Sequence, residues 1–160
     1  MRAFARVTLL TALLSAACGP TVDLTTGLQI EVIDTGWYDA GIVQGQNKLV
    51  PAARVTIKNV SEQTLVQLQL NAQFRRVTDP EEWGYAFITA AGSQGLAPGA
   101  TAGPFLLRSE HGYTGSDETR QDMLKNSQFV DAKVQLFAKY GSVQWVRKGE
   151  HPIRRQLIEK

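Results

Sequence analysis

Alternation of apolar and polar residues dominates the chain beyond its N-terminal segment. The clearest example is LVQLQLNAQF, residues 65–74, in which apolar side chains alternate with Gln and Asn from Val66 onward. A strand of this kind has one buried face and one face in water, which is typical of antiparallel sheets. The pattern therefore predicts several antiparallel strands and an all-β fold. The same period of two recurs at 28–32, 54–58, 132–140 and 143–145.

Turn-forming residues separate these predicted strands. Pro98-Gly99 precedes a further extended segment, and KNVSEQT, residues 58–64, is typical of a hairpin connection. Gly141-Ser142 predicts a two-residue turn with positive φ angles. Short strands at this spacing favour a β-sandwich or barrel.

One helix is expected, in GSDETRQDMLKN at residues 115–126. Ser116 or Asp117 is the predicted N-cap, and acidic residues follow in the first turn, where they favour the positive end of the helix dipole. Met123 and Leu124 are its predicted apolar contacts. In a sandwich such a helix would be a short crossover between the two sheets.

The N-terminal segment has the three parts of a secretory signal. Arg2 and Arg6 flank an apolar run at 7–14, which is followed by small residues. That run is too short to cross a bilayer permanently, since a spanning helix needs roughly 20 apolar residues. We therefore expect the protein to be exported. The only cysteine of the chain, Cys18, comes directly after the small residues.

The sequence LSAAC, residues 14–18, resembles the bacterial lipobox. The resemblance implies that Cys18 is diacylated, becomes the first residue of the mature chain and anchors the protein in a membrane. Gly19, where aspartate would imply inner-membrane retention, favours the outer membrane. The alternative is an ordinary signal peptide cleaved near Ala17, which leaves a free thiol. The expected organisation is a signal peptide (1–17), a lipidated N-terminus and tether (18–26) and one domain (27–160).

Composition supports a single folded domain without nucleic acid as its partner. The 160 residues are 43% hydrophobic and 20% charged, which is enough to bury one core. Two of the 17 Lys and Arg residues, Arg2 and Arg6, leave with the signal peptide, so that the remainder balances the 15 Asp and Glu residues. A nearly neutral domain lacks the basic face that nucleic-acid binding requires.

Residues that could support catalysis or metal binding are sparse. His111 and His151 each adjoin a glutamate, but they lie 40 positions apart and lack the spacing of a metalloprotease helix. We expect both on surface loops. The sequence contains no G-x-S-x-G, P-loop or G-x-G-x-x-G motif. The prediction is therefore a protein that is not an enzyme, with no catalytic residues, metal, cofactor or small-molecule substrate.

Aromatic residues are the candidate contact surface. Trp37, Tyr38 and Tyr113 lie beside glycines and are predicted to contact a partner, because aromatic side chains dominate many binding surfaces. The alternative is that they close the ends of the core. The segment WGYAF, residues 83–87, has aromatics at alternate positions and is predicted to be a buried strand face.

The C-terminal segment, residues 146–160, mixes basic and apolar residues. It is predicted to form a last strand with a charged, solvated face, and Pro152 suits an edge position that needs no hydrogen-bond donor. The alternative is a basic patch that meets anionic lipid or peptidoglycan.

Residues 53–74 and 95–105, with a strand ending in Asn-x-Ser and a later L-x-P-G turn, resemble bacterial extracytoplasmic immunoglobulin-like domains, including the FxLYD type. The resemblance implies an immunoglobulin-like antiparallel β-sandwich with one short helix and no catalysis. We therefore expect a lipid-anchored bacterial envelope protein that is a binding or assembly module for a protein partner. A cell-wall or glycan-binding lipoprotein and an enzyme of unrecognised class are the alternatives.

Overall fold

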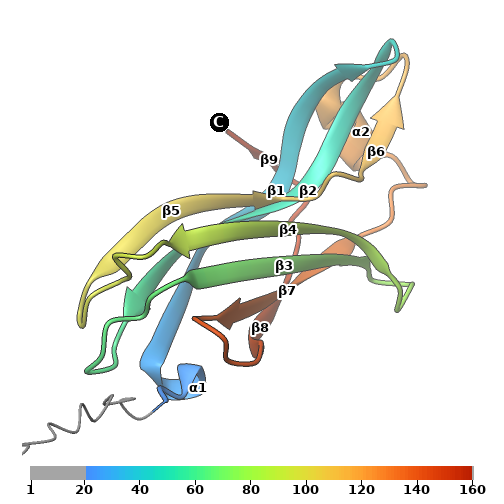
Figure 1. Cartoon of the computed structure of the whole chain (residues 1–160). Helices are drawn as coiled ribbons and strands as arrows, with labels where there is room; N and C mark the ends of the chain where they lie inside the picture. The colour runs from blue at the N-terminus through green and yellow to red at the C-terminus, as the bar shows by residue number, and fades with distance from the viewer. Residues whose placement is uncertain (1–20, 160) are drawn as a thin grey trace, which may run out of the picture.

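Two β-sheets packed face to face make up residues 21–159, the part of the chain that the computed structural model describes (Figure 1). The predicted signal peptide, 1–17, and Cys18 lie outside the described residues. The elements in chain order are α1 (Leu24–Gly27), β1 (Leu28–Val43), β2 (Gln46–Asn59), β3 (Leu68–Arg76), β4 (Glu82–Ala91), β5 (Thr101–Arg108), β6 (Tyr113–Gly115), α2 (Arg120–Lys125), β7 (Ala132–Lys139), β8 (Val146–Pro152) and β9 (Leu157–Ile158).

The first sheet has the order β5-β2-β1-β9, with β6 also paired to β2, and the second has the order β4-β3-β7-β8. All pairs are antiparallel except β1 with β9, which is parallel. Strands β5, β2, β1 and β9 of the first sheet face strands β4, β3, β7 and β8 of the second, which is the arrangement of a two-layer β-sandwich. The predicted all-β antiparallel sandwich is confirmed, although it has two short helices rather than one.

Alternating positions of the central strands build the core. Since successive side chains of a strand point to opposite faces, every second residue of β3 and β7 enters the space between the sheets. Full burial of one such aliphatic side chain contributes roughly 1.5–3 kcal/mol. The inward residues that are at most 2% exposed include Val55 and Ile57 of β2, Leu68, Leu70, Ala72 and Phe74 of β3, and Val134, Leu136 and Ala138 of β7.

The segment 58–64 is not a hairpin connection, because β2 and β3 belong to different sheets. The buried amide of Asn59 organises the crossover instead. Its Nδ2 donates to the carbonyls of Gln63 and Leu96, each at 2.7 Å, and its Oδ1 accepts from the backbone N–H of Ser61 at 2.9 Å. Val66 was expected to begin the alternation, but it is 41% exposed and the strand begins at Leu68.

Gly141 and Ser142 do lie in a turn, in which the Val143 N–H donates to the Tyr140 carbonyl at 3.2 Å and Gly141 has a φ of +51°. The turn does not join two strands directly, since β7 ends at Lys139 and β8 begins at Val146. The loop between β7 and β8 is longer because it also contacts the crossover between β2 and β3. The Gly141 N–H donates to the carbonyl of Val66 at 3.1 Å, which joins this loop to the β2–β3 crossover.

Helix α2 begins later than expected. Thr119 is its N-cap, and Thr119 Oγ1 accepts from the Asp122 N–H at 3.2 Å, so neither Ser116 nor Asp117 caps it. Met123 and Leu124 are buried, as predicted. The helix follows β6 of the first sheet and precedes β7 of the second, which confirms the crossover.

Residues 22–26 do not form a free tether. Asp23 caps α1 by accepting from the Thr25 N–H at 2.8 Å, and Leu24 is 1% exposed. The Val22 N–H donates to the Tyr140 hydroxyl at 2.5 Å. This segment therefore belongs to the folded domain. Within residues 21–159, no helix is long and apolar enough to cross a membrane.

Candidate functional site

Trp37 lies at the centre of a buried aromatic cluster. It is 0% exposed, and its ring centroid is 4.5 Å from Phe129, 5.6 Å from Tyr113 and 6.1 Å from Trp83. The prediction that Trp37 contacts a partner is therefore wrong, because the side chain is enclosed where the two sheets meet the α2 crossover. Packing of this kind stabilises the core beyond simple burial of area.

Tyr38 and Tyr113 are both half-buried. Tyr38 follows Trp37 in β1 and so points to the opposite face of the sheet, where the Arg108 guanidinium lies 4.8 Å from its ring centroid. The Tyr113 hydroxyl is 3.2 Å from both the carbonyl and the N–H of Val130. The structure therefore places Tyr113 in the aromatic cluster with Trp37, and Tyr38 away from it.

The aromatic residues of β4 do not share one buried face. Phe74 pairs with Gly84 and Arg75 pairs with Glu82, so Trp83 is an extra residue, a β-bulge. A bulge reverses the alternation that follows it. Trp83 packs against the core, whereas Tyr85 and Phe87 are 51% and 49% exposed. The expectation of a buried 83–87 face is wrong for this reason.

Strand β4 is also an open edge. In the described chain it pairs with β3 only, and the other edge of its sheet is β8. Edge strands are usually protected by charged residues, proline or short length, because their unpaired backbone groups invite another strand. From Trp83 to Ala91, β4 contains no charged residue and no proline, whereas β8 contains Arg147, Lys148, Glu150 and Pro152. Pro152 is thus on an edge strand, as predicted.

The remaining edges in the described residues are better protected than β4. Strand β5 contains Pro104, which cannot donate to a ladder. Strand β9 is only two residues long and pairs only with Trp37 and Tyr38, so residues 28–36 of β1 also have an unpaired edge, but that stretch carries the charged residues Glu31 and Asp34. Among the long edges of the described residues, β4 is therefore the one without charged residues or proline from Trp83 to Ala91, and a further strand could pair with it.

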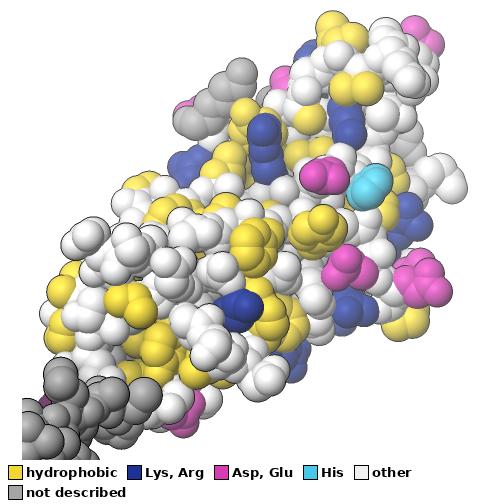
Figure 2. All heavy atoms as spheres, in the orientation of Figure 1, with side chains coloured by type: hydrophobic (Ala, Val, Ile, Leu, Met, Phe, Trp, Pro, Cys, Tyr) yellow, Lys and Arg dark blue, Asp and Glu magenta, His cyan; other side chains and the backbone are white. Residues whose placement is uncertain are grey.

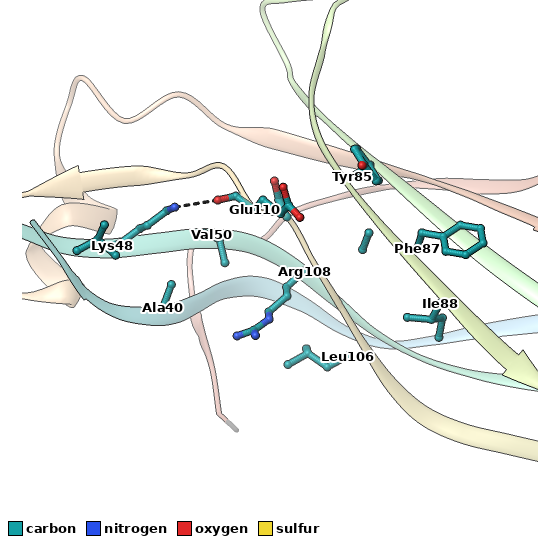
Figure 3. A pocket seen from close by; sticks show the side chains of 12 residues that line it. Ala40, Lys48, Val50, Tyr85, Phe87, Ile88, Leu106, Arg108 and Glu110 are labelled. Atoms are coloured by element: carbon teal, nitrogen blue, oxygen red, sulfur yellow. Dashed lines mark hydrogen bonds between the residues drawn. The ribbon is translucent and has the colours of Figure 1, made fainter.

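A groove of about 590 Å³ runs beside β4. Residues 85–88 of β4 form one wall, and β1, β2 and β5 form the other (Figure 3). On the far wall, Lys48 Nζ donates to the Glu110 carbonyl at 2.8 Å, and Arg108 lies over Tyr38. The side chains along the far wall are Ala40, Val43, Lys48, Val50, Leu106, Arg108, Ser109 and Glu110.

The outer face of the second sheet adjoins this groove. On this face the aromatic side chains of β4 lie beside amide side chains of β3, since Tyr85 pairs with Gln73 and Phe87 pairs with Asn71. Trp145, 38% exposed, packs edge-on against Phe87 at 6.1 Å. The face is therefore a mixture of aromatic rings and amide groups.

One carboxylate on this face has a shifted pKa. A hydrogen bond from Gln135 Nε2 at 2.7 Å lowers the pKa of Glu150, and the charges of Lys133 and Arg147 act in the same direction. Glu150 therefore stays ionised and binds its neighbours on β7 and β8, so it is not suited to act as a general acid near neutral pH.

The two histidines lie apart. His111 is exposed in the loop after β5, as predicted, but His151 lies within β8, where it pairs with Val134, and not in a loop. Within residues 21–159, no three His, Cys, Asp or Glu side chains are grouped closely enough to hold a metal ion.

Comparisons with known proteins add little to this geometry. No protein-family model matches the chain, and no curated protein matches its sequence. Among solved structures it is similar to the X-ray structure of Northeast Structural Genomics Consortium target SoR45, with 12% sequence identity and a TM-score of 0.45. That match covers 82% of this chain and 89% of the other.

Sequence reasoning missed the β4 edge because it treated 83–87 as an interior strand. A usable feature was present: residues 83–91, WGYAFITAA, form an uncharged run without proline. Such a run fits either a buried strand or an unprotected edge, and only the order of strands in the sheet distinguishes them.

Proposed function

We propose that this protein is a lipid-anchored bacterial envelope lipoprotein whose domain is a non-catalytic binding or assembly module for a protein partner. The observation that carries the proposal is the long, uncharged edge of β4 beside a groove. We infer that an extended segment of the partner pairs with this edge by strand addition.

Strand addition uses two features that β4 combines. Backbone N–H and C=O groups on the free edge bond the partner's main chain, and pockets beside the edge accept its alternate side chains. Side chains directed into the groove would meet Ile88, Val50 and Leu106. Those directed to the other side would meet the outward-facing rings of Tyr85 and Phe87, which also border the groove.

The proposed lipid anchor supports this role because it raises the effective concentration of the domain near partners on the same membrane surface. The LSAAC sequence supports acylation of Cys18, and Gly19 supports the outer membrane as the final location. A domain held at a surface meets partners of the same surface at a high effective concentration. We therefore expect partner capture in cells to be weaker for the Cys18→Ser variant than for the acylated protein.

Site-specific photo-crosslinking in cells tests the proposed edge. A photoreactive amino acid replaces Thr89, an exposed residue of β4, and in a matched control it replaces Gln29, an exposed residue of β1 in the other sheet. We expect a discrete protein adduct from position 89 and none from position 29.

A charged substitution on β4 provides a second test of partner binding along this edge. Phe87→Lys places a positive charge at an exposed β4 position, and Gln29→Lys is its control. Loss of the position 89 adduct in Phe87→Lys and its retention in Gln29→Lys are the expected results. Equal adducts in the two variants would show that the partner does not bind along β4.

A glycan-binding lipoprotein is the second candidate, favoured by the outer face of the second sheet. Planar rings beside amides suit sugars, whose apolar faces stack on aromatics while their hydroxyls bond amide groups. Co-sedimentation of the mature domain with purified peptidoglycan, compared with a Trp145→Ala variant, tests this candidate. Absence of co-sedimentation removes it. The outward residues concerned are Tyr85, Phe87, Phe137 and Trp145, with Gln69, Asn71, Gln73 and Gln135.

A further inference from the structure

We propose that one end of the sandwich rests on the lipid bilayer that holds the acyl chains of Cys18. This anchor-proximal end consists of three loops, 60–67, 92–100 and 140–145, and its occupant is the lipid surface itself. The inference rests on the proposed acylation of Cys18, and it adds a second contact with the membrane and a fixed orientation of the domain.

Chain length places this end near the membrane. Thr21 is three positions after Cys18, and an extended chain spans at most about 3.6 Å per residue, so the two Cα atoms are at most about 11 Å apart. The Val22 N–H is bonded to the Tyr140 hydroxyl, so the chain enters the fold directly beside the 140–145 loop. An acylated Cys18 therefore leaves little distance between this loop and the headgroups.

Hydrogen bonds join the three loops and the entering chain into one surface. The Val60 N–H donates to the Gly27 carbonyl at 3.0 Å, which holds the first loop against α1. The Gly141 N–H donates to the Val66 carbonyl, and the Gln67 N–H donates to the Gly92 carbonyl at 2.9 Å. The loops therefore meet the bilayer together, and Figure 1 shows them at the end of the sandwich where α1 lies.

The charge of this end suits a lipid interface. The three loops contain a single charged side chain, Glu62. Their exposed residues include Val60 and Val66, at 40% and 41% exposure, and in Figure 2 the part of this lower-left end that grey atoms leave visible shows mostly hydrophobic and other uncharged groups, with an acidic side chain at its lower edge. The opposite end is rich in charged residues: Asp39, Lys48, Glu110, Asp117, Glu118, Arg120, Asp122 and Lys125.

Trp145 is the side chain best suited to enter the interface. Tryptophan favours the boundary between headgroups and acyl chains. Lys139 Nζ lies 5.2 Å from the centroid of its ring, and a long lysine side chain can reach the headgroups while its stem stays apolar. The other two tryptophans, Trp37 and Trp83, pack within the aromatic cluster.

Contact at this end fixes the orientation of the domain relative to the bilayer. The β1–β2 hairpin extends away from α1, toward β6 and α2 (Figure 1), so its tip would point away from the bilayer. Ile42, near that tip, is 69% exposed and provides a reporter position far from the three loops.

Fluorescence quenching by brominated lipid tests the proposal. The acylated full-length protein is reconstituted into phosphatidylethanolamine and phosphatidylglycerol vesicles in which part of the lipid carries brominated acyl chains. Vesicle flotation first establishes anchoring. We expect the brominated lipid to quench part of the tryptophan emission of the wild-type protein, and we expect Trp145→Phe to remove this quenching.

A matched control uses the opposite end. Ile42→Trp in the Trp145→Phe background places an exposed tryptophan at the hairpin tip, and its emission is expected to be unaffected by brominated lipid. Quenching that persists in Trp145→Phe, or that appears for Ile42→Trp, would overturn the orientation while leaving the anchor intact. If the wild-type protein does not float with the vesicles, the lipid anchor fails, and the inference fails with it.

Discussion

The phenolic oxygen of Tyr140 accepts a hydrogen bond from the backbone N–H of Val22 at 2.5 Å, across 118 positions of the chain. This contact joins the residues that follow the predicted lipidation site to the loop after β7. Together with the buried side chain of Leu24, it makes residues 22–27 an integral part of the sandwich. The tether available to an acylated Cys18 is correspondingly short.

Removal of the Tyr140 hydroxyl is expected to loosen the N-terminal segment. Tyr140→Phe leaves the Val22 N–H without its partner, so we expect a loss of about 0.5–1.5 kcal/mol and faster amide exchange in 22–27. Urea denaturation and hydrogen exchange measure these effects. Tyr85→Phe, which alters an exposed hydroxyl, is the control. Identical exchange in the two variants would contradict the role given to Tyr140.

The buried Asn59 is expected to be the most sensitive polar residue of the β2–β3 crossover. Asn59→Ala leaves the carbonyls of Gln63 and Leu96 and the N–H of Ser61 without this partner. We expect a loss of about 2–3 kcal/mol in the free energy of unfolding. Asn71→Ala removes an amide whose Oδ1 has no partner, and a comparable loss in that variant would contradict the account.

The charge of Asp23 predicts a pH effect at α1. Hydrogen bonds from Thr25, the backbone N–H first, hold the pKa of the Asp23 carboxyl below its ordinary value, and Lys148 adds a favourable charge. A lowered pKa means that the cap stabilises the folded state above the ordinary pKa of the carboxyl and that this is lost as the pH falls through the lowered pKa.

We therefore expect the amide of Thr25 to lose protection from exchange in acid, over a range below the ordinary pKa of aspartate. Asp23→Asn keeps an N-cap oxygen without a titrating group, so it should remove this pH dependence. NMR of the Thr25 amide across the acid range measures both. Persistence of the same pH profile in Asp23→Asn would assign the effect to another group.

The bulge at Trp83 separates two aromatic residues that a regular strand would place on one face. Trp83→Ala should cost about 2–3 kcal/mol, somewhat less than for a fully buried tryptophan, because it opens a cavity beside Trp37 and Tyr113. Phe87→Ala should cost less than about 1 kcal/mol, since the ring is half exposed. Similar losses in the two variants would mean that β4 has no bulge.

Much of the fold follows from local pattern. The alternation in β3 and β7 correctly identifies their buried faces. Successive side chains of a strand point to opposite faces, so a few residues are enough to show which face is apolar. Met123 and Leu124 were identified similarly, from their position in a short helix. The antiparallel sandwich follows from the one-sided character of these strands.

The errors concern relationships over long distances in the sequence. The crossover at 58–64 resembles a hairpin until Asn59 is seen to bond Leu96, and 22–26 resembles a tether until Tyr140 is seen to bond Val22. In β4, one extra residue at Trp83 exchanges buried and exposed aromatics, and no local property of WGYAF reveals it. The open edge of β4 depends on the order of all strands in its sheet.

Hydrogen exchange of β4 in the partner complex tests the central claim most directly. The acylated protein cross-linked to its partner is compared with the acylated protein alone, and amide exchange is followed along residues 84–90. We expect amides on the free edge of β4 to become protected on binding, while those of β8, the other edge of the same sheet, are unchanged. Unchanged exchange in β4, with protection elsewhere in the domain, would contradict strand addition at this edge.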